Sequence, residues 1–224
     1  MIHDDFLQYE TSTTYDLIIG NPPYFVMKKK DVPESYYDYF EGRPNIFILF
    51  LIKSLHLLNE NGILSFVLPR NFLNCLYYDK TRKYIVDHFH IISILECDDD
   101  YMDTKQDTII LILQDKTPEP KSKYATTIGR FTIFGLLEHL QEMKLLTQDS
   151  TTLEKLGFEV TVGNIVWNMC KKELTDDSSH TLLVYSSDIK HNRLEIQQYR
   201  NDAKKNYIQR KGSREPLLVI NRGY

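Results

Sequence analysis

The sequence is poor in cysteine, glycine and proline and has no long hydrophobic run. Its 224 residues include three cysteines, nine glycines and eight prolines. Three cysteines form neither an even disulfide framework nor a zinc-ligand spacing, and the low glycine and proline content excludes collagen-like and linker-dominated chains. The longest apolar run, which begins at Ile46, is too short to span a bilayer, and the first residues lack the features of a signal peptide. We therefore expect a globular, intracellular (cytoplasmic) protein with no membrane partner and no metal site.

The charge is distributed unevenly along the chain. Residues 1–120 carry a net charge of -8 and residues 121–224 a net charge of +4. Eight basic residues lie within Lys190–Arg214, against only two acidic ones. The basic residues singled out as candidates for contacts with a nucleic-acid backbone are Lys190, Arg200, Lys204 and Lys205. This stretch predicts a polyanion partner, although a solvated basic surface would give the same composition.

Short apolar runs alternate with stretches of helical spacing in the first half of the chain. The expected strands are residues 15–20, 62–69, 90–97 and 107–114, and the expected helices are residues 45–58 and 72–89. Apolar runs of this kind are typical of a sheet covered on both faces, so the expected fold class is α/β. Only an acidic loop separates the last two strands, which could therefore pair antiparallel at one end of the sheet.

A polar segment with two prolines, Lys116–Lys123, marks the expected domain boundary. The predicted division is a first domain over residues 1–115, a linker and connecting helix over 116–150, and a second domain over 151–224. Within the later part, we expect partial helix over 128–146 and strands over 160–166, 181–185 and 216–221. The second domain is therefore predicted to be richer in β structure.

The residues with the clearest chemistry are Asn21, Pro22, Pro23 and Tyr24, which directly follow the strand that ends at Gly20. In an open α/β sheet, the carboxyl end of a strand faces the ligand crevice. Two prolines remove two backbone donors and hold the Pro22 carbonyl in a fixed position. That carbonyl and the Asn21 side-chain oxygen supply two acceptors for an amine, while the Tyr24 ring offers a face for an aromatic base. A proline-rich turn whose tyrosine covers the core is the structural alternative.

This motif and its flanking strands resemble the amino-methylating DNA methyltransferases, specifically the gamma-type adenine-N(6) enzymes and the related fused restriction-modification proteins. The resemblance covers residues 1–115 and extends weakly into the rest, which resembles the start of a target-recognition domain. It implies the C-terminal half of a Rossmann-like methyltransferase sheet, S-adenosylmethionine as cofactor and double-stranded DNA as substrate.

The same resemblance assigns roles to individual residues. Asn21 and the Pro22 carbonyl would accept hydrogen bonds from the exocyclic amine of adenine, and Tyr24 would stack on the base flipped out of the duplex. The resemblance also assigns Asp5 and Phe6 to the cofactor adenine, and Tyr101 and Asn45 to substrate binding. Tyr101 could equally be a surface tyrosine in an acidic loop, and Asp5 could be a solvated residue near a chain end.

Two features of this family are missing from the sequence. No Gly-x-Gly occurs anywhere, and only 14 residues precede the strand at Tyr15, so we expect a fragment that has lost the glycine-rich cofactor loop. One hypothesis is a methyltransferase whose cofactor half lies on a second polypeptide, which would leave this chain inactive alone. Alternatives are an inactive DNA-binding remnant and a methyltransferase that acts on RNA or on protein glutamine.

Overall fold

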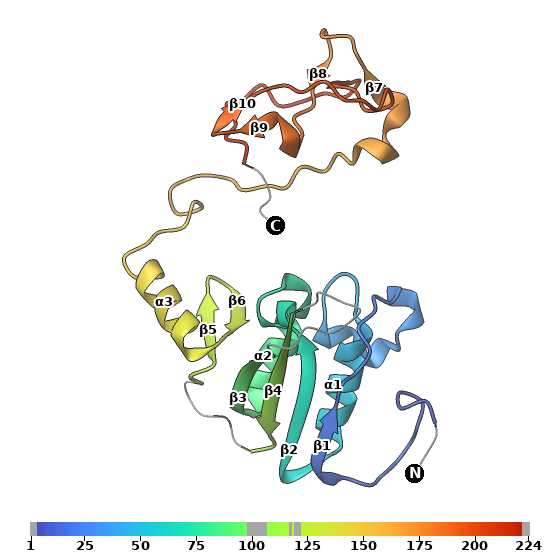
Figure 1. Ribbon diagram of the computed structural model, residues 1–224, viewed down its shortest axis with the longest axis vertical. Helices are drawn as coiled ribbons and strands as arrows, with labels where there is room; N and C mark the ends of the chain where they lie inside the picture. Colours follow the sequence, from blue (N-terminus) through green and yellow to red (C-terminus); the bar gives the residue numbers. More distant parts are fainter. Residues whose placement is uncertain (1–3, 98–106, 117, 119–121, 221–224) are drawn as a thin grey trace. The chain divides into compact units, whose positions relative to one another are not determined.

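The computed structural model describes residues 4–97, 107–116, 118 and 122–220 (Figure 1). Its contacts divide the chain into two compact units, Met1–Thr151 and Thr152–Tyr224. Each unit has its own secondary structure, and we describe each separately. Within the described residues, no helix combines the length and apolar character needed to cross a bilayer.

The first unit is built on a four-stranded sheet. Its strands are β1 (Tyr15–Gly20), β2 (Leu58–Pro69), β3 (His90–Cys97) and β4 (Thr108–Gln114), in the order β1-β2-β4-β3. Strand β1 runs parallel to β2, and β4 runs antiparallel to both β2 and β3. The α/β class and the expected antiparallel pair at the end of the sheet are thus confirmed.

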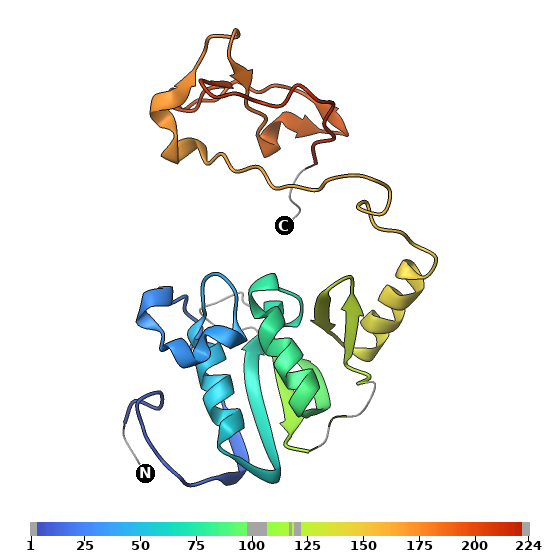
Figure 2. The ribbon, with the colours of Figure 1, turned by 180° about the vertical axis from the view of Figure 1, so that it is seen from behind.

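Two helices, α1 (Ile46–His56) and α2 (Asp79–His88), cover one face of this sheet, as Figures 1 and 2 show from opposite sides. The core between these helices and the sheet contains Phe47, Leu64 and Ile109, whose side chains are all 0% exposed. The opposite face carries neither helix. Successive strand residues point to opposite faces, so Ile18 packs on the core while Leu17 and Ile19 remain 56% and 72% exposed. The expectation that both faces are covered was therefore wrong for the described residues.

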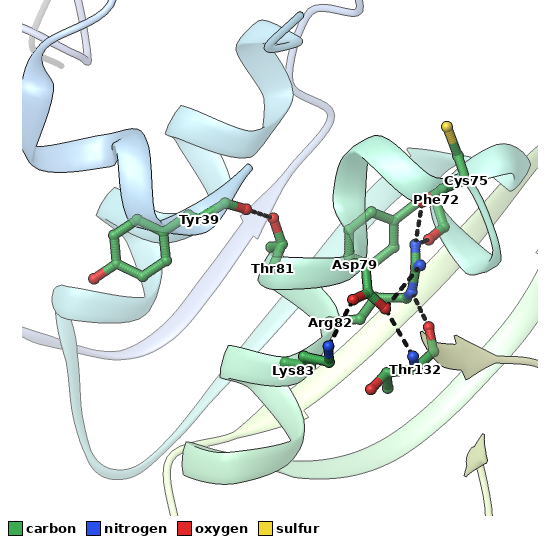
Figure 3. Close-up of polar contacts among 8 residues, drawn as sticks. All are labelled: Tyr39, Phe72, Cys75, Asp79, Thr81, Arg82, Lys83 and Thr132. Atoms are coloured by element: carbon green, nitrogen blue, oxygen red, sulfur yellow. Dashed lines mark hydrogen bonds and ion pairs between the residues drawn. The ribbon is translucent and has the colours of Figure 1, made fainter. Parts of the chain in front are cut away.

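The expected helix over 72–89 is interrupted. Two 3-10 turns, η3 (Arg70–Leu73) and η4 (Leu76–Tyr78), precede α2. The Arg82 side chain is fully buried and donates hydrogen bonds to the carbonyls of Phe72 and Cys75, both at 2.9 Å (Figure 3). We infer that these carbonyls accept hydrogen bonds from the guanidinium instead of from the backbone amides of a continuous α-helix. This explains why the helix begins only at Asp79.

Further elements pack on the first unit after β4. A hairpin of β5 (Ala125–Ile128) and β6 (Phe131–Phe134) precedes α3 (Leu137–Thr147). Tyr124 and Phe134 join the main core, so residues expected to form a linker fold with the first unit. The partial helix expected over 128–146 is confined to α3, because the hairpin takes the earlier residues.

The second unit has little regular structure. It contains five two-residue strands: β7 (Leu174–Thr175), β8 (Thr181–Leu182), β9 (Ile189–Lys190), β10 (Arg193–Leu194) and β11 (Tyr207–Ile208). The β character is confirmed, but the positions differ. Residues 160–166 form no strand, nor do the described residues of 216–221, and the segment 181–185 is a strand only in β8. Val160 and Val162 are 62% and 81% exposed, so no neighbouring strand stabilises that segment.

The remaining short elements are 3-10 turns. They are η1 (Lys29–Asp31), η2 (Glu34–Tyr39), η5 (Trp167–Met169), η6 (Lys171–Glu173) and η7 (Ser186–Asp188). The first two lie between the Asn-Pro-Pro-Tyr motif and α1, where they complete the wall of the core through Val32 and Phe40.

Candidate active site

The Asn-Pro-Pro-Tyr motif begins where β1 ends. Because β1 and β2 are parallel, their carboxyl ends lie at one edge of the sheet, where α/β proteins bind ligands. Gly20 closes the strand against Phe66: a Cβ at Gly20 would stand 2.9 Å from the Phe66 ring. A larger residue there would displace the ring, so glycine keeps the motif close to the end of β2.

Tyr24 links the motif to β2 through its hydroxyl. The phenol oxygen lies 2.7 Å from the Asn21 side-chain oxygen and 2.7 Å from the Val67 carbonyl oxygen. The ring packs edge-on against Phe47 at 6.1 Å between centroids. Tyr24 therefore joins the core while its hydroxyl reaches the candidate catalytic side chain.

The two prolines differ in their surroundings. Pro22 is buried, whereas Asn21 and Pro23 are exposed. Among the described residues, no backbone or side-chain donor bonds the Pro22 carbonyl. This agrees with a rigid carbonyl that regular structure leaves available, but its role toward a substrate amine stays a prediction.

Asn45 occupies the N-cap of α1 and is 9% exposed. Its side-chain oxygen accepts a hydrogen bond from the Phe47 amide at 3.4 Å. Burial raises the pKa of Tyr78 to about 12, and a hydrogen bond with Asn45 opposes that rise. The neighbouring Ile46 amide donates to the Phe25 carbonyl. Asn45 thus anchors the chain just after the motif, and its expected role in substrate binding stays a prediction.

Asp5 and Phe6 lie in a turn beside α1. The Asp5 carboxylate accepts a hydrogen bond from the Leu7 amide at 3.0 Å. The Phe6 ring packs on the Phe50 ring at 5.1 Å between centroids. The Lys53 ammonium lies 5.2 Å from the centroid of the Phe6 ring. The position of Phe6 is therefore fixed by packing on α1.

A pocket of about 400 Å³ runs along β1, and its lining includes Asp4, Phe6, Tyr9, Leu17 and Ile19. A flat ring next to an acidic side chain suits the adenine of S-adenosylmethionine, because adenine can stack and its amine can donate. The described lining contains neither glycine nor a basic side chain. The residues present therefore fit the adenine end of the cofactor but not its methionine carboxylate.

The basic residues of the second unit mostly contact their own chain. Lys190 donates to the Gln197 side chain at 2.9 Å, and Lys205 pairs with Asp176 at 2.5 Å. The Lys204 ammonium lies 3.6 Å from the ring centroid of Tyr199 and 4.3 Å from that of Tyr185. These three have intrachain partners that sequence reasoning did not foresee, and their role toward nucleic acid stays a prediction.

Arg200 differs from the other three candidates. It is exposed and forms no ion pair within the described chain. Tyr101, the expected second aromatic of the site, lies outside the described residues. Sequence reasoning also missed the Val67 carbonyl, which no local motif marks because 43 positions separate it from Tyr24.

Comparisons with known proteins show similarity to restriction-modification methylases. Residues 2–102 match the model of the Eco57I restriction-modification methylase family. The chain is 34% identical over 139 residues to the type II methyltransferase M.CvrRI of Paramecium bursaria Chlorella virus XZ-6E, covering 59% of this chain and 36% of that protein. It is 26% identical over 201 residues to the modification methylase CviBIII of Paramecium bursaria Chlorella virus NC1A, covering 88% and 48%.

Among solved structures, a class I S-adenosylmethionine-dependent methyltransferase of Listeria monocytogenes has a TM-score of 0.46 at 21% identity. That match covers 54% of this chain and 39% of the other. The chain therefore spans less than half the length of each of these three proteins.

Proposed function

Because residues 2–102 match the model of the Eco57I restriction-modification methylase family, we propose that the chain carries the substrate-binding half of a DNA adenine-N6 methyltransferase. The observation that supports this most is the position of Asn21 at the carboxyl end of β1, with the Tyr24 hydroxyl 2.7 Å from its side-chain oxygen. The fold and family imply S-adenosylmethionine as the cofactor. When bound, it supplies an electrophilic methyl group.

The motif acts by holding the adenine amine. The Asn21 oxygen and the Pro22 carbonyl would accept hydrogen bonds from its two N–H groups, which would turn the nitrogen lone pair toward the methyl donor. The proton that the methylated nitrogen gives up would pass to water by way of the Asn21 oxygen and the Pro22 carbonyl. Alignment contributes much of the acceleration, since well-oriented reactants gain several orders of magnitude in rate.

Tyr24 would set the orientation of the Asn21 amide. A phenol has one proton and can donate it to only one acceptor at a time. The acceptor on Asn21 is its side-chain oxygen, which has a second lone pair left for a substrate amine, so donation by the phenol would hold this oxygen at the site. The hydroxyl of Tyr24 is in this proposal a positioning group, while its ring stacks on the flipped base.

Binding of the whole cofactor would need residues beyond those that line the pocket along β1. Phe6 would contact the adenine of the cofactor, with Asp4 rather than the expected Asp5 in the pocket lining, but the pocket along β1 has no group for the methionine carboxylate. A further segment or a second polypeptide would supply that part. The exposed Leu17 and Ile19 on β1 offer it an apolar surface, since sheets with parallel strands are normally covered on both faces.

Methyl transfer by a reconstituted protein tests this proposal. The chain would be combined with the part of M.CvrRI that it does not match and assayed with adenine-containing duplex DNA and labelled S-adenosylmethionine. Label in N6-methyladenine supports the function, and label that depends on RNA or on protein glutamine would favour those substrates instead. Tight DNA binding with no label on any substrate would favour an inactive binding module.

A further inference from the structure

A second pocket, of about 500 Å³, lies at the carboxyl end of β2. The residues that follow β2 form one wall, which includes Asn71 and Asn74, and His139 on α3 forms another. Phe134 and Leu140 lie beneath them and are each 2% exposed. Because β1 and β2 are parallel, this pocket and the Asn-Pro-Pro-Tyr motif share one edge of the sheet, although no motif residue lines it.

The walls of the pocket are held together by a buried charge network, shown in Figure 3. Arg82 donates to the carbonyls of Phe72 and Cys75 on one side and to the Thr132 carbonyl of β6 at 2.6 Å on the other. The Asp79 carboxylate accepts a hydrogen bond from the Thr132 amide at 2.7 Å. Hydrogen bonds to charged groups are short and strong, so the pocket is preformed and needs no ligand to shape it.

The lining combines an apolar floor with amide groups. The apolar part of the lining includes the partly exposed Ile133 and Met143, while the exposed Asn71 and Asn74 each carry a donor and an acceptor. Side-chain amides pair with the edges of nucleobases, adenine above all. The volume is within the range of small-molecule sites. A planar heterocycle with polar edges fits this combination of surfaces.

The charges of the pocket disfavour a phosphate group. Its one arginine, Arg70, pairs with Glu96 at 2.6 Å and lies 3.9 Å from the Asp107 carboxylate. The guanidinium charge is therefore already balanced by two carboxylates. A pocket that bound a phosphate would need uncompensated positive charge or convergent backbone amides.

We propose that this pocket binds a nucleobase of the DNA substrate other than the adenine that receives the methyl group. The proposal rests on the proposed function, because it takes nucleic acid to be the substrate. It assigns part of the base recognition to the first unit, through Asn71 and Asn74, and assigns Arg82 the role of a positioning residue.

The test is a titration of the full chain with each of the four deoxynucleosides and with inorganic phosphate. NMR signals of the asparagine side-chain amides are recorded at each step of the titration. We expect at least one deoxynucleoside to shift the Asn71 and Asn74 signals saturably. Replacing both with aspartate should weaken that binding at least tenfold. The matched control is Gln141→Glu, on an exposed α3 residue outside the pocket lining, and it should leave the binding unchanged.

Signals from Asn21 separate this proposal from the proposed function. Shifts confined to Asn21 would overturn the second pocket and leave the proposed function standing. Shifts at Asn71 and Asn74 that persist in Asn21→Ala would support the pocket whatever the outcome at the motif. Shifts of Asn71 and Asn74 with inorganic phosphate that equal those with a deoxynucleoside would overturn the proposed nucleobase pocket. The absence of shifts at Asn71 and Asn74 at millimolar deoxynucleoside would also overturn it.

Discussion

The Tyr24 hydroxyl bridges the Asn21 side chain and the Val67 carbonyl, at 2.7 Å from each oxygen. One side chain thereby ties the loop after β1 to the neighbouring strand β2. The loop carries the Asn21 amide, so its contact with β2 restrains the group that, under the proposed function, would hold a substrate amine. Mutations at this bridge should affect catalysis and binding in different ways.

Asn21→Ala should lower turnover without weakening DNA binding. It removes one of two acceptors that align the amine, and losing one such group costs roughly 10²-fold or more in rate. The effect should be in kcat, because alignment matters most in the transition state. Single-turnover methylation by the reconstituted protein measures it. Parental rates in Asn21→Ala would remove the motif from catalysis.

Tyr24→Phe and Tyr24→Ala should separate the hydroxyl from the ring. The phenylalanine variant keeps the stacking face but loses the hydroxyl contact, so turnover should fall while base capture persists. The alanine variant should also lose about 1–3 kcal/mol of stacking on the flipped base. Fluorescence of 2-aminopurine at the target position reports base capture. Equal loss of fluorescence in both variants would contradict a separate role for the ring.

Arg82→Met should destabilise the first unit strongly. The substitution keeps much of the side-chain length but leaves three carbonyls and the Asp79 carboxylate without the guanidinium. Breaking a buried charged pair typically costs about 3–5 kcal/mol. Urea denaturation measures the change in the free energy of unfolding. Lys83→Met is the control, since Lys83 pairs with the same carboxylate at 2.9 Å but is half-exposed, and it should cost under about 1 kcal/mol.

The stability of the first unit should fall in strong alkali through Tyr78. Burial raises the pKa of this phenol to about 12, so the folded state holds its proton at a pH where the unfolded state has lost it. The resulting stabilisation is complete below pH 10, the model value for tyrosine, and is lost as the pH rises to about 12. Tyr78→Phe should flatten the decline of unfolding free energy over this interval, as measured by urea denaturation at each pH. An unchanged decline would assign it to other groups.

Arg200→Gln should reduce the salt dependence of DNA binding more than Lys204→Gln. Arg200 has no ion-pair partner in the described chain, whereas Lys204 lies against two tyrosine rings. Each lost phosphate contact should lower the log-log salt slope by about 0.9. Affinities measured at several salt concentrations give the slope. A larger change with Lys204→Gln would mean that DNA displaces the lysine from its rings.

The strand and motif positions could be read from the sequence because their signals are local. Strand β1 ends at Gly20 as expected, since asparagine and two prolines follow it directly. Strand β2 begins four residues earlier than expected, at Leu58. The polar residues before Gly62 belong to the strand because β2 pairs with β1 from Tyr15 onward.

Long-range contacts could not be read in this way. The break in the helix expected over 72–89 coincides with the Arg82 side chain, which also reaches Thr132, 50 positions away. The intrachain partners of Lys190, Lys204 and Lys205 are likewise set by folding of the second unit. A basic composition records the charges of a stretch but not which of them the fold has already neutralised.

The open edge of β1 has a consequence for handling the isolated chain. In the part of the sheet that the structure describes, β1 pairs only with β2, and its Leu17 and Ile19 are exposed; such an edge is a template for association between copies. A lysine at position 17 would improve solubility in isolation. Under the proposed function, the same lysine would obstruct the segment that covers this strand, so at this strand the demands of solubility and of assembly oppose each other.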